Sequence, residues 1–374
     1  MIRKLFIALV LFSVSFASMP MRPPVMAQQG STVQALTHYA LTVYSGPNRS
    51  NAIIGVLNPH AKVILESRNA DLSWVLARSL DGLLRGWVEP RYLTLSDDAN
   101  IAKLFVSTEI MFFPTTHSAY DTIDLTAYPI VPDDLGRARD IYERGLVHGA
   151  DSHTISKVGD CISDNVSFLS PFGRGQYALG NYVGLQAVVD HYAASLAQDS
   201  LAAYDGLVTT AVLDPVFSNP LACLPGETPL RCEYRVRESS VAIIMFGAQD
   251  LLFTNINDFD RNLRRVVHET IEAGVIPILS TFPGNTQLWD QSLLYNQAVV
   301  QIALDYEIPL MNLWLALEQL PNHGLGSDGR HLSAAITSPG DLSTDRNLQR
   351  GYPLRNLVTL QALDVVWRGV TSVD

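Results

Sequence analysis

The sequence predicts an α/β fold in which helices cover a parallel sheet, preceded by a smaller all-β domain. Three observations lead to this fold class. In the second half of the chain, short apolar runs alternate with segments of helical periodicity. Runs such as 241–247 and 275–283 are apolar almost throughout, which is typical of strands buried on both faces. In the first hundred residues, by contrast, short alternating strands are separated by turn residues.

Length and composition indicate a folded protein of more than one domain. The chain has 374 residues, more than one hydrophobic core usually serves, and 47% of them are hydrophobic. The formal net charge is −11, and no stripe of Lys and Arg offsets it. Because the phosphate backbone of a nucleic acid would be repelled, we expect no nucleic-acid partner.

The first 27 residues have the features of a secretory signal peptide. Arg3 and Lys4 precede an apolar run from Leu5 to about Ala17, and the triplet 25–27 resembles a cleavage site. The run is short for a bilayer span, so a cleaved signal is preferred to an uncleaved anchor. No later stretch has the length and apolarity of a membrane span. We therefore expect a mature protein that is secreted or held in the cell envelope.

The three cysteines bear on the same question. Cys223 and Cys232 flank a turn-rich loop, and a disulfide between them would persist outside the reducing cytoplasm. Cys161 is left over. It is either a free thiol or half of an intermolecular bond.

Residues 34–95 predict a small β-barrel. They resemble a bacterial SH3-like (SH3b) domain through the pattern L-x-V-x-S-G-P at 41–47 and the pattern G-W-V-x-x-x-Y-L at 86–93. The resemblance implies a binding or spacer module that often faces the cell envelope, with a cell-wall or glycan ligand. Its aromatic residues are interpreted as barrel core: Trp74, Trp87 and Tyr92.

Residues 96–150 are predicted to connect the two domains and to contain one amphipathic helix, at about 134–149. Residues 151–374 form the predicted α/β domain, in which a strand ends just before Cys161. In a parallel sheet, function lies beyond the carboxyl ends of the strands. Further strands are expected at 241–247, 275–283 and 308–314, and helices at 258–273 and 291–305.

Three pieces of sequence bring reactive residues to that edge. Cys161 follows a strand and opens a helix, whose N-terminal N–H groups would favour a thiolate and lower the thiol pKa. Gln249 follows the strand 241–247 and carries an amide donor. Asp328 and His331 are three residues apart, so the carboxylate can orient the imidazole toward a nucleophile. The chain has no G-x-S-x-G elbow, which disfavours the common α/β-hydrolase arrangement.

From about Ser156 to Arg368 the chain resembles the GDSL/SGNH hydrolases, which are secreted esterases and lipases on a flavodoxin-like, doubly wound parallel sheet. The segment 159–161 matches the block G-D-S, with cysteine in place of the serine nucleophile. The segment 247–250 matches G-x-N-D, with glutamine in place of asparagine, and 328–331 matches D-x-x-H in full.

The resemblance also implies a role for each site residue. Cys161 would be the nucleophile, His331 the base and then the acid, and Asp328 the carboxylate that orients it. The N–H groups of Cys161 and Gly206, with the amide of Gln249, would form the oxyanion hole. The implied activity is hydrolysis or transfer of an acyl ester, on a small molecule or an acylated envelope or extracellular polysaccharide, without a cofactor.

Alternatives remain open beside this enzyme hypothesis. Sulfur is larger than the oxygen for which such a site is shaped, and Gln249 carries its amide one methylene farther out; either change weakens catalysis. The second hypothesis is therefore a catalytically inactive glycan- or cell-wall-binding protein on the same scaffold. A redox role for Cys161 is the third, although the chain has no C-x-x-C, and Ser163 is a minor alternative nucleophile. The histidines lack metal-type spacing, so we expect no zinc site.

Overall fold

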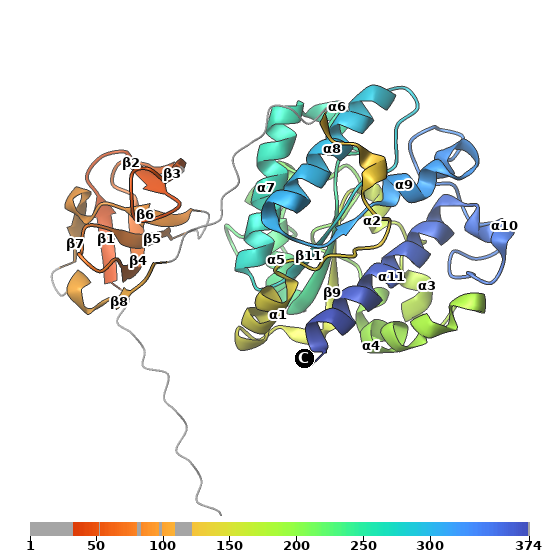
Figure 1. The fold of residues 1–374 in the computed structure, drawn as a ribbon, viewed down its shortest axis with the longest axis horizontal. Helices are drawn as coiled ribbons and strands as arrows, with labels where there is room; N and C mark the ends of the chain where they lie inside the picture. The colour runs from red at the N-terminus through yellow and green to blue at the C-terminus, as the bar shows by residue number, and fades with distance from the viewer. Residues whose placement is uncertain (1–32, 52, 81–83, 97–98, 109–121, 373–374) are drawn as a thin grey trace, which may run out of the picture. The chain divides into compact units, whose positions relative to one another are not determined.

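The computed structural model describes residues 33–51, 53–80, 84–96, 99–108 and 122–372 (Figure 1). The signal peptide predicted at 1–27 lies outside these residues. The chain divides into two compact units, one all-β and one α/β. Within the described ranges no helix combines the length and apolarity that crossing a bilayer requires.

The all-β unit is a sheet of short strands in the order β3-β2-β6-β5-β4-β1-β7, with β8 paired to β4. β4 pairs antiparallel with both β1 and β5, as antiparallel barrels and meanders require. Trp74 and Trp87 are buried, which confirms their interpretation as core, whereas Tyr92 is partly exposed. The strands are β1 (Val33–Thr37), β2 (Leu41–Tyr44), β3 (Ile53–Leu57), β4 (Lys62–Arg68), β5 (Val75–Ser79), β6 (Arg85–Val88), β7 (Leu93–Leu95) and β8 (Phe105–Val106).

The α/β unit is built on a parallel sheet in the order β12-β11-β10-β9. Every residue of β10 is buried, as expected for a strand covered on both faces. The predicted mixed α/β class with a parallel sheet is therefore confirmed. The strands are β9 (Asp151–Gly159), β10 (Ser239–Met245), β11 (Ile276–Ser280) and β12 (Leu310–Met311).

The last strand is shorter than the apolar run 308–314 predicted. Asn312 ends β12 and caps the next helix, because its side chain accepts a hydrogen bond from the Leu315 N–H. The remaining apolar residues of the run therefore begin helix α9 rather than extending the strand.

A further segment lies beside β9. Gly159 forms a parallel bridge with Ala203, and the Gly159 N–H donates to the Ala202 carbonyl at 3.0 Å. After β9 the chain first forms this segment on one side of β9 and then forms β10 on the other side. In open α/β sheets, ligands bind at the carboxyl ends of the strands where the order reverses in this way, which here is just after Gly159.

Helices pack against the sheet in two groups. α5, α7 and α8 form one group, and α1, α4 and α11 form the other. Since β10 is buried throughout, we infer that each group covers one face (Figure 1). The helices are α1 (Ala138–Val147), α2 (Cys161–Asp164), α3 (Ser170–Gly173), α4 (Gln186–Leu196), α5 (Pro229–Arg237), α6 (Asp250–Phe253), α7 (Ile256–Glu272), α8 (Trp289–Tyr306), α9 (Leu313–Glu318), α10 (Asp345–Leu348) and α11 (Gly351–Thr371).

Most helices expected from periodicity are present. α7 and α8 correspond to the helices expected at 258–273 and 291–305, and their ends differ from the prediction by one or two residues. α7 begins at an Asn255 cap, whose side chain accepts a hydrogen bond from the Asp258 N–H at 3.0 Å. The amphipathic helix expected near 134–149 is α1.

Part of the predicted connector packs on the α/β unit. The Asn312 side chain donates hydrogen bonds to the carbonyls of Leu125 and Tyr128 at 2.8 and 3.0 Å, and its N–H donates to the Ile130 carbonyl. The domain boundaries themselves stay predictions. A truncated chain meant to keep the α/β unit intact must nevertheless retain these residues.

Candidate active site

Cys161 begins helix α2 at the carboxyl end of β9. The Asp160 carboxylate caps this helix by accepting a hydrogen bond from the Ile162 N–H at 3.0 Å. Gly159 leaves no room for a side chain, because a Cβ there would lie 2.3 Å from the Met245 carbonyl oxygen. The sharp strand-to-helix turn therefore presents the half-buried thiol of Cys161 at this edge of the sheet.

His331 and Asp328 reach this thiol from a loop 170 residues farther along the chain. His331 Nε2 lies 3.3 Å from Cys161 Sγ, and His331 Nδ1 lies 2.5 Å from Asp328 Oδ2. Burial opposes ionisation of Asp328, but hydrogen bonds from His331 and from the Arg330 N–H outweigh it and hold the carboxyl pKa below its usual value. A carboxylate, an imidazole and a thiol thus stand in one continuous relay.

The pKa of the Cys161 thiol is raised, whereas the sequence led us to expect a lowered pKa. Burial, reinforced by the carboxylates of Asp160 and Asp205, raises the pKa of Cys161 to about 12, although Arg330 opposes the shift. The expectation of a lowered pKa was wrong because α2 is a single turn, whose weak dipole is outweighed by burial and two nearby anions. The thiol is therefore protonated at neutral pH and needs a base at the moment of attack, as a serine hydroxyl does.

Gly206 lies in a turn that follows the segment beside β9. The Leu207 N–H donates to the Tyr204 carbonyl at 3.2 Å, and Gly206 has a φ of +80°, which favours glycine. The adjacent Asp205 carboxylate acts on the Cys161 thiol, so the turn lies within electrostatic reach of it. Use of the Gly206 N–H by an oxyanion stays a prediction.

Gln249 stands at the same edge, between β10 and α6. A glycine is required two residues earlier, at Gly247, because a Cβ there would lie 2.1 Å from the Phe282 ring. The backbone amide of Gln249 is one of the groups that favour the ionised form of Asp160, so Gln249 lies beside the residue that caps the Cys161 helix. The oxyanion role of its side-chain amide stays a prediction.

Two buried carboxylates lie behind these residues. Asp160 and Asp250 are fully buried, and desolvation raises the pKa of each to about 6. Asp250 accepts hydrogen bonds from the N–H and the hydroxyl of Thr209 at 2.9 and 2.6 Å. Asp250 therefore ties the chain that follows Gly206 to the start of α6.

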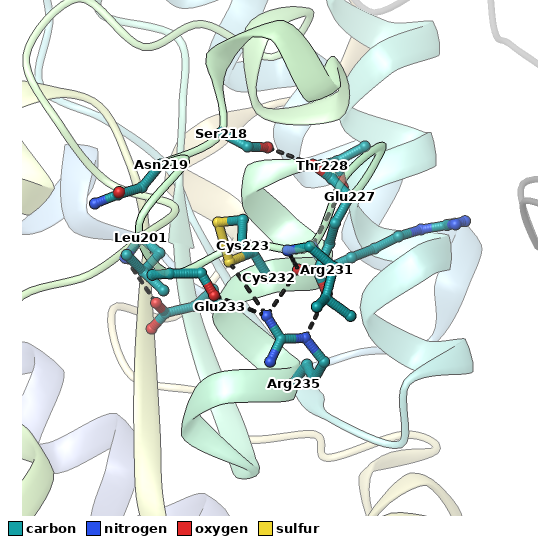
Figure 2. The surroundings of a disulfide bond; sticks show 12 residues. Leu201, Ser218, Asn219, Cys223, Glu227, Thr228, Arg231, Cys232, Glu233 and Arg235 are labelled. Carbon is teal, nitrogen blue, oxygen red and sulfur yellow. Dashed lines mark hydrogen bonds and ion pairs between the residues drawn. A yellow bond between two sulfur atoms is a disulfide. The ribbon is translucent and has the colours of Figure 1, made fainter.

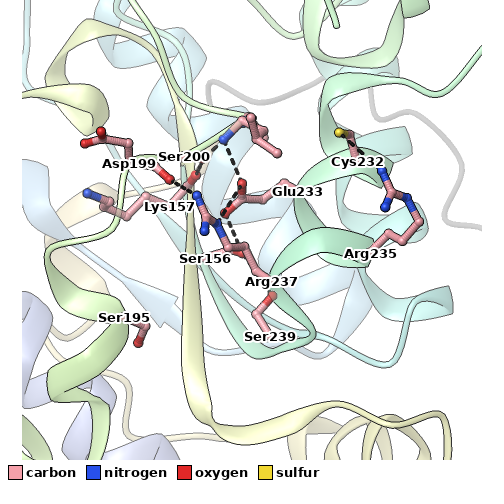
Figure 3. Close-up of polar contacts among 12 residues, drawn as sticks. Ser156, Lys157, Ser195, Asp199, Ser200, Cys232, Glu233, Arg235, Arg237 and Ser239 are labelled. Carbon is pink, nitrogen blue, oxygen red and sulfur yellow. Dashed lines mark hydrogen bonds and ion pairs between the residues drawn. The ribbon is translucent and has the colours of Figure 1, made fainter. Parts of the chain in front are cut away.

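A buried glutamate that no sequence motif marked holds the segment leading to Gly206. Glu233 in α5 accepts a hydrogen bond from the Ser156 hydroxyl at 2.8 Å (Figure 3). It accepts another from the Leu201 N–H at 2.7 Å. Ser156 belongs to β9 and Leu201 to the segment beside it, so one carboxylate joins both. Burial raises the pKa of Glu233 against the effect of these hydrogen bonds.

The expected disulfide between Cys223 and Cys232 is confirmed and joins α5 to the loop before it (Figure 2). Arg235 strengthens the same corner by donating to the Glu227 carboxylate at 2.7 and 2.8 Å. The disulfide therefore anchors the helix that carries Glu233, and Cys161 is the free cysteine.

Comparisons with known proteins concern the fold. No protein-family model matches the chain, and no curated protein matches it. Similar solved structures include a lipase/acylhydrolase from Enterococcus faecalis, with 18% identity over 58% of this chain and 96% of that one and a TM-score of 0.37. The psychrotrophic esterase EstA from Pseudoalteromonas sp. has 18% identity over 57% and 97%, with a TM-score of 0.36. A catalytic mutant of the acetylxylan esterase Axe2 from Geobacillus stearothermophilus has 16% identity over 60% and 99%, with a TM-score of 0.39.

Proposed function

We propose that this protein hydrolyses or transfers acyl groups from esters at an SGNH-type site with Cys161 as the nucleophile. The observation that carries the proposal is the relay from Asp328 Oδ2 to His331 Nδ1 at 2.5 Å and from His331 Nε2 to Cys161 Sγ at 3.3 Å. A carboxylate on Nδ1 favours the tautomer whose Nε2 carries a lone pair. That lone pair faces the thiol proton.

The reaction takes place in two steps. In the first, His331 accepts the thiol proton while sulfur attacks the carbonyl carbon, and the carbonyl electron pair moves to oxygen. The tetrahedral intermediate then breaks its ester C–O bond, and His331 returns the proton to the departing alcohol. In the second step, water or an acceptor hydroxyl gives its proton to His331 and attacks the thioester, releasing an acid or a new ester and restoring the Cys161 thiol.

The developing oxyanion needs donors that are in place beforehand. The N–H of Cys161 is at the start of α2, where helix N–H groups have no partner inside the helix. With the N–H of Gly206 and the side-chain amide of Gln249, it forms the proposed oxyanion hole. Removing one such donor costs about 3–4 kcal/mol of transition-state stabilisation.

The proposed setting is outside the cytoplasm. The disulfide between Cys223 and Cys232 supports export, because such bonds persist in oxidising compartments. The patterns at 41–47 and 86–93 support an SH3b-like module that binds a cell wall or glycan. We therefore propose an acylated envelope or extracellular polysaccharide as the ester, with small soluble esters as surrogates.

The test is turnover of p-nitrophenyl acetate, p-nitrophenyl butyrate and an acetylated polysaccharide by the full chain. Cys161→Ala should abolish turnover and His331→Ala should reduce it sharply, while both keep the melting temperature of the wild type. Mass spectrometry after acid quenching should find an acyl group on Cys161. A wild type that turns over no ester and carries no acyl group would reject the enzyme; polysaccharide binding by that protein would establish the binding-protein alternative.

A further inference from the structure

A fully buried arginine lies behind the nucleophile. Arg355 in α11 is 0% exposed, and it donates hydrogen bonds to the Ile162 carbonyl at 2.6 Å and to the Ser163 hydroxyl at 3.0 Å. Both acceptors belong to α2, whose first residue is Cys161. On another side, the guanidinium carbon lies 3.6 Å from the centre of the Phe168 ring, which suits a cation–π contact.

Such a residue is costly to bury. Desolvation lowers the pKa of Arg355 to about 10, while the electrostatic effects of Tyr352, Asp160 and Cys161 oppose the shift. Among the described residues, its hydrogen bonds go to a carbonyl and a hydroxyl rather than to a carboxylate. A buried cation without a close anion adds little to the free energy of folding. The role of Arg355 is therefore inferred from the groups that it contacts.

Arg355 contacts a helix that has few hydrogen bonds of its own. α2 is a single turn, in which the N–H groups of Ser163 and Asp164 both donate to the Asp160 carbonyl. A helix this short depends on outside contacts for its orientation. The Asp160 side chain fixes its beginning, and Arg355 fixes the Ile162 carbonyl and the Ser163 hydroxyl.

We propose that Arg355 is the positioning residue of the nucleophile: it clamps α2 from behind and thereby aims the Cys161 thiol at His331. Its positive charge acts in addition, because a nearby cation favours an anionic sulfur. The inference rests on the proposed function, in which Cys161 is the nucleophile. The charged and titratable groups that act on this thiol come from several elements: Asp160, Asp205, Arg330, His331, Tyr352 and Arg355.

Three variants separate charge from clamping. Arg355→Met removes both, Arg355→Lys keeps the charge but loses the two-pronged contact, and Ser163→Ala removes one hydrogen bond at constant charge. Arg264→Lys is the matched control, since Arg264 is also buried but pairs with Asp260 at 2.9 Å in α7.

The first readout is alkylation of Cys161 by iodoacetamide at pH 8, followed by peptide mass spectrometry, which needs no ester substrate. In Arg355→Met the rate should fall several-fold, because loss of a nearby cation raises a thiol pKa. Arg355→Lys, Ser163→Ala and Arg264→Lys should keep the wild-type rate and its pH dependence.

The second readout is ester turnover. Both Arg355 variants and Ser163→Ala should lose kcat with KM unchanged, because thiol direction matters only as the bond forms. Arg264→Lys should lower only the melting temperature. If Arg355→Met does not fold, Arg355→Lys and Ser163→Ala still test the clamp.

Wild-type kcat in folded Arg355→Lys and Ser163→Ala would overturn the clamp, and an unchanged alkylation rate in folded Arg355→Met would overturn the effect of charge. If the wild type turns over no ester, the proposed function fails by itself. The angle at which α2 holds Cys161 is then compared by crystallography of Arg355→Lys and the wild type, and an unchanged thiol direction would reject the inference.

Discussion

Replacing Cys161 by serine tests whether the site is built around sulfur. The substitution restores the hydroxyl of the G-D-S block but also moves the nucleophilic atom. A carbon–oxygen bond is shorter than a carbon–sulfur bond by several tenths of an ångström. The distance from Cys161 Sγ to His331 Nε2 is 3.3 Å. A serine oxygen on the same Cβ would lie more than about 3.5 Å from Nε2, outside hydrogen-bond range.

The surroundings resist closing that gap. Asp328 holds His331 through Nδ1, and Asp160 and Arg355 hold α2. A misplacement of about 1 Å at a reacting atom costs about 100-fold in rate. The displacement here is several tenths of an ångström, less than half of that, so we expect Cys161→Ser to lower kcat on p-nitrophenyl acetate about tenfold with little change in KM.

The assay compares steady-state kinetics and the acylation burst of the wild type, Cys161→Ser and Cys161→Ala. The burst is needed because an oxygen ester and a thioester deacylate at different rates, which could mask a change in acylation. Equal or faster acylation by Cys161→Ser would show that α2 and His331 adjust to either atom, and the argument from fixed geometry would fail.

Three further predictions follow from other parts of the site. Asp205→Asn should speed alkylation of Cys161 several-fold, because it removes a nearby anion; an unchanged rate would place that turn away from the thiol. The pKa of Asp250 is raised to about 6, so the stability that it contributes is present below about pH 4 and is lost as the pH rises through 6. In urea unfolding, Asp250→Asn should make the free energy of unfolding fall less between about pH 4 and pH 6 than in the wild type. The same dependence on pH in both proteins would contradict the raised pKa. Reducing the Cys223–Cys232 disulfide should lower the free energy of unfolding by about 2–3 kcal/mol; a reduced protein as stable as the oxidised one would refute this estimate.

Much of the local structure was predictable from the sequence because its causes are local. Apolar runs and helical periodicity lie within single segments, and they indicated the parallel sheet and the place of Cys161 at the end of β9. The pairing of Asp328 with His331 follows from a spacing of three residues in one turn. The meeting of His331 with Cys161, 170 residues apart, was expected only through the resemblance to a family and the rule that parallel strands present their carboxyl ends at one edge.

The tertiary structure alone decided the environment of the thiol. A helix start after Cys161 suggested a lowered pKa, but burial, together with a carboxylate from the distant Asp205 turn, raised it. Arg355 is in an ordinary helical stretch with no motif, and only the packing of α11 against α2 buries it against the nucleophile's helix. Burial and electrostatics sum the effects of neighbours in space, and a sequence orders its residues along the chain, so these two properties of the site could not be obtained from the sequence.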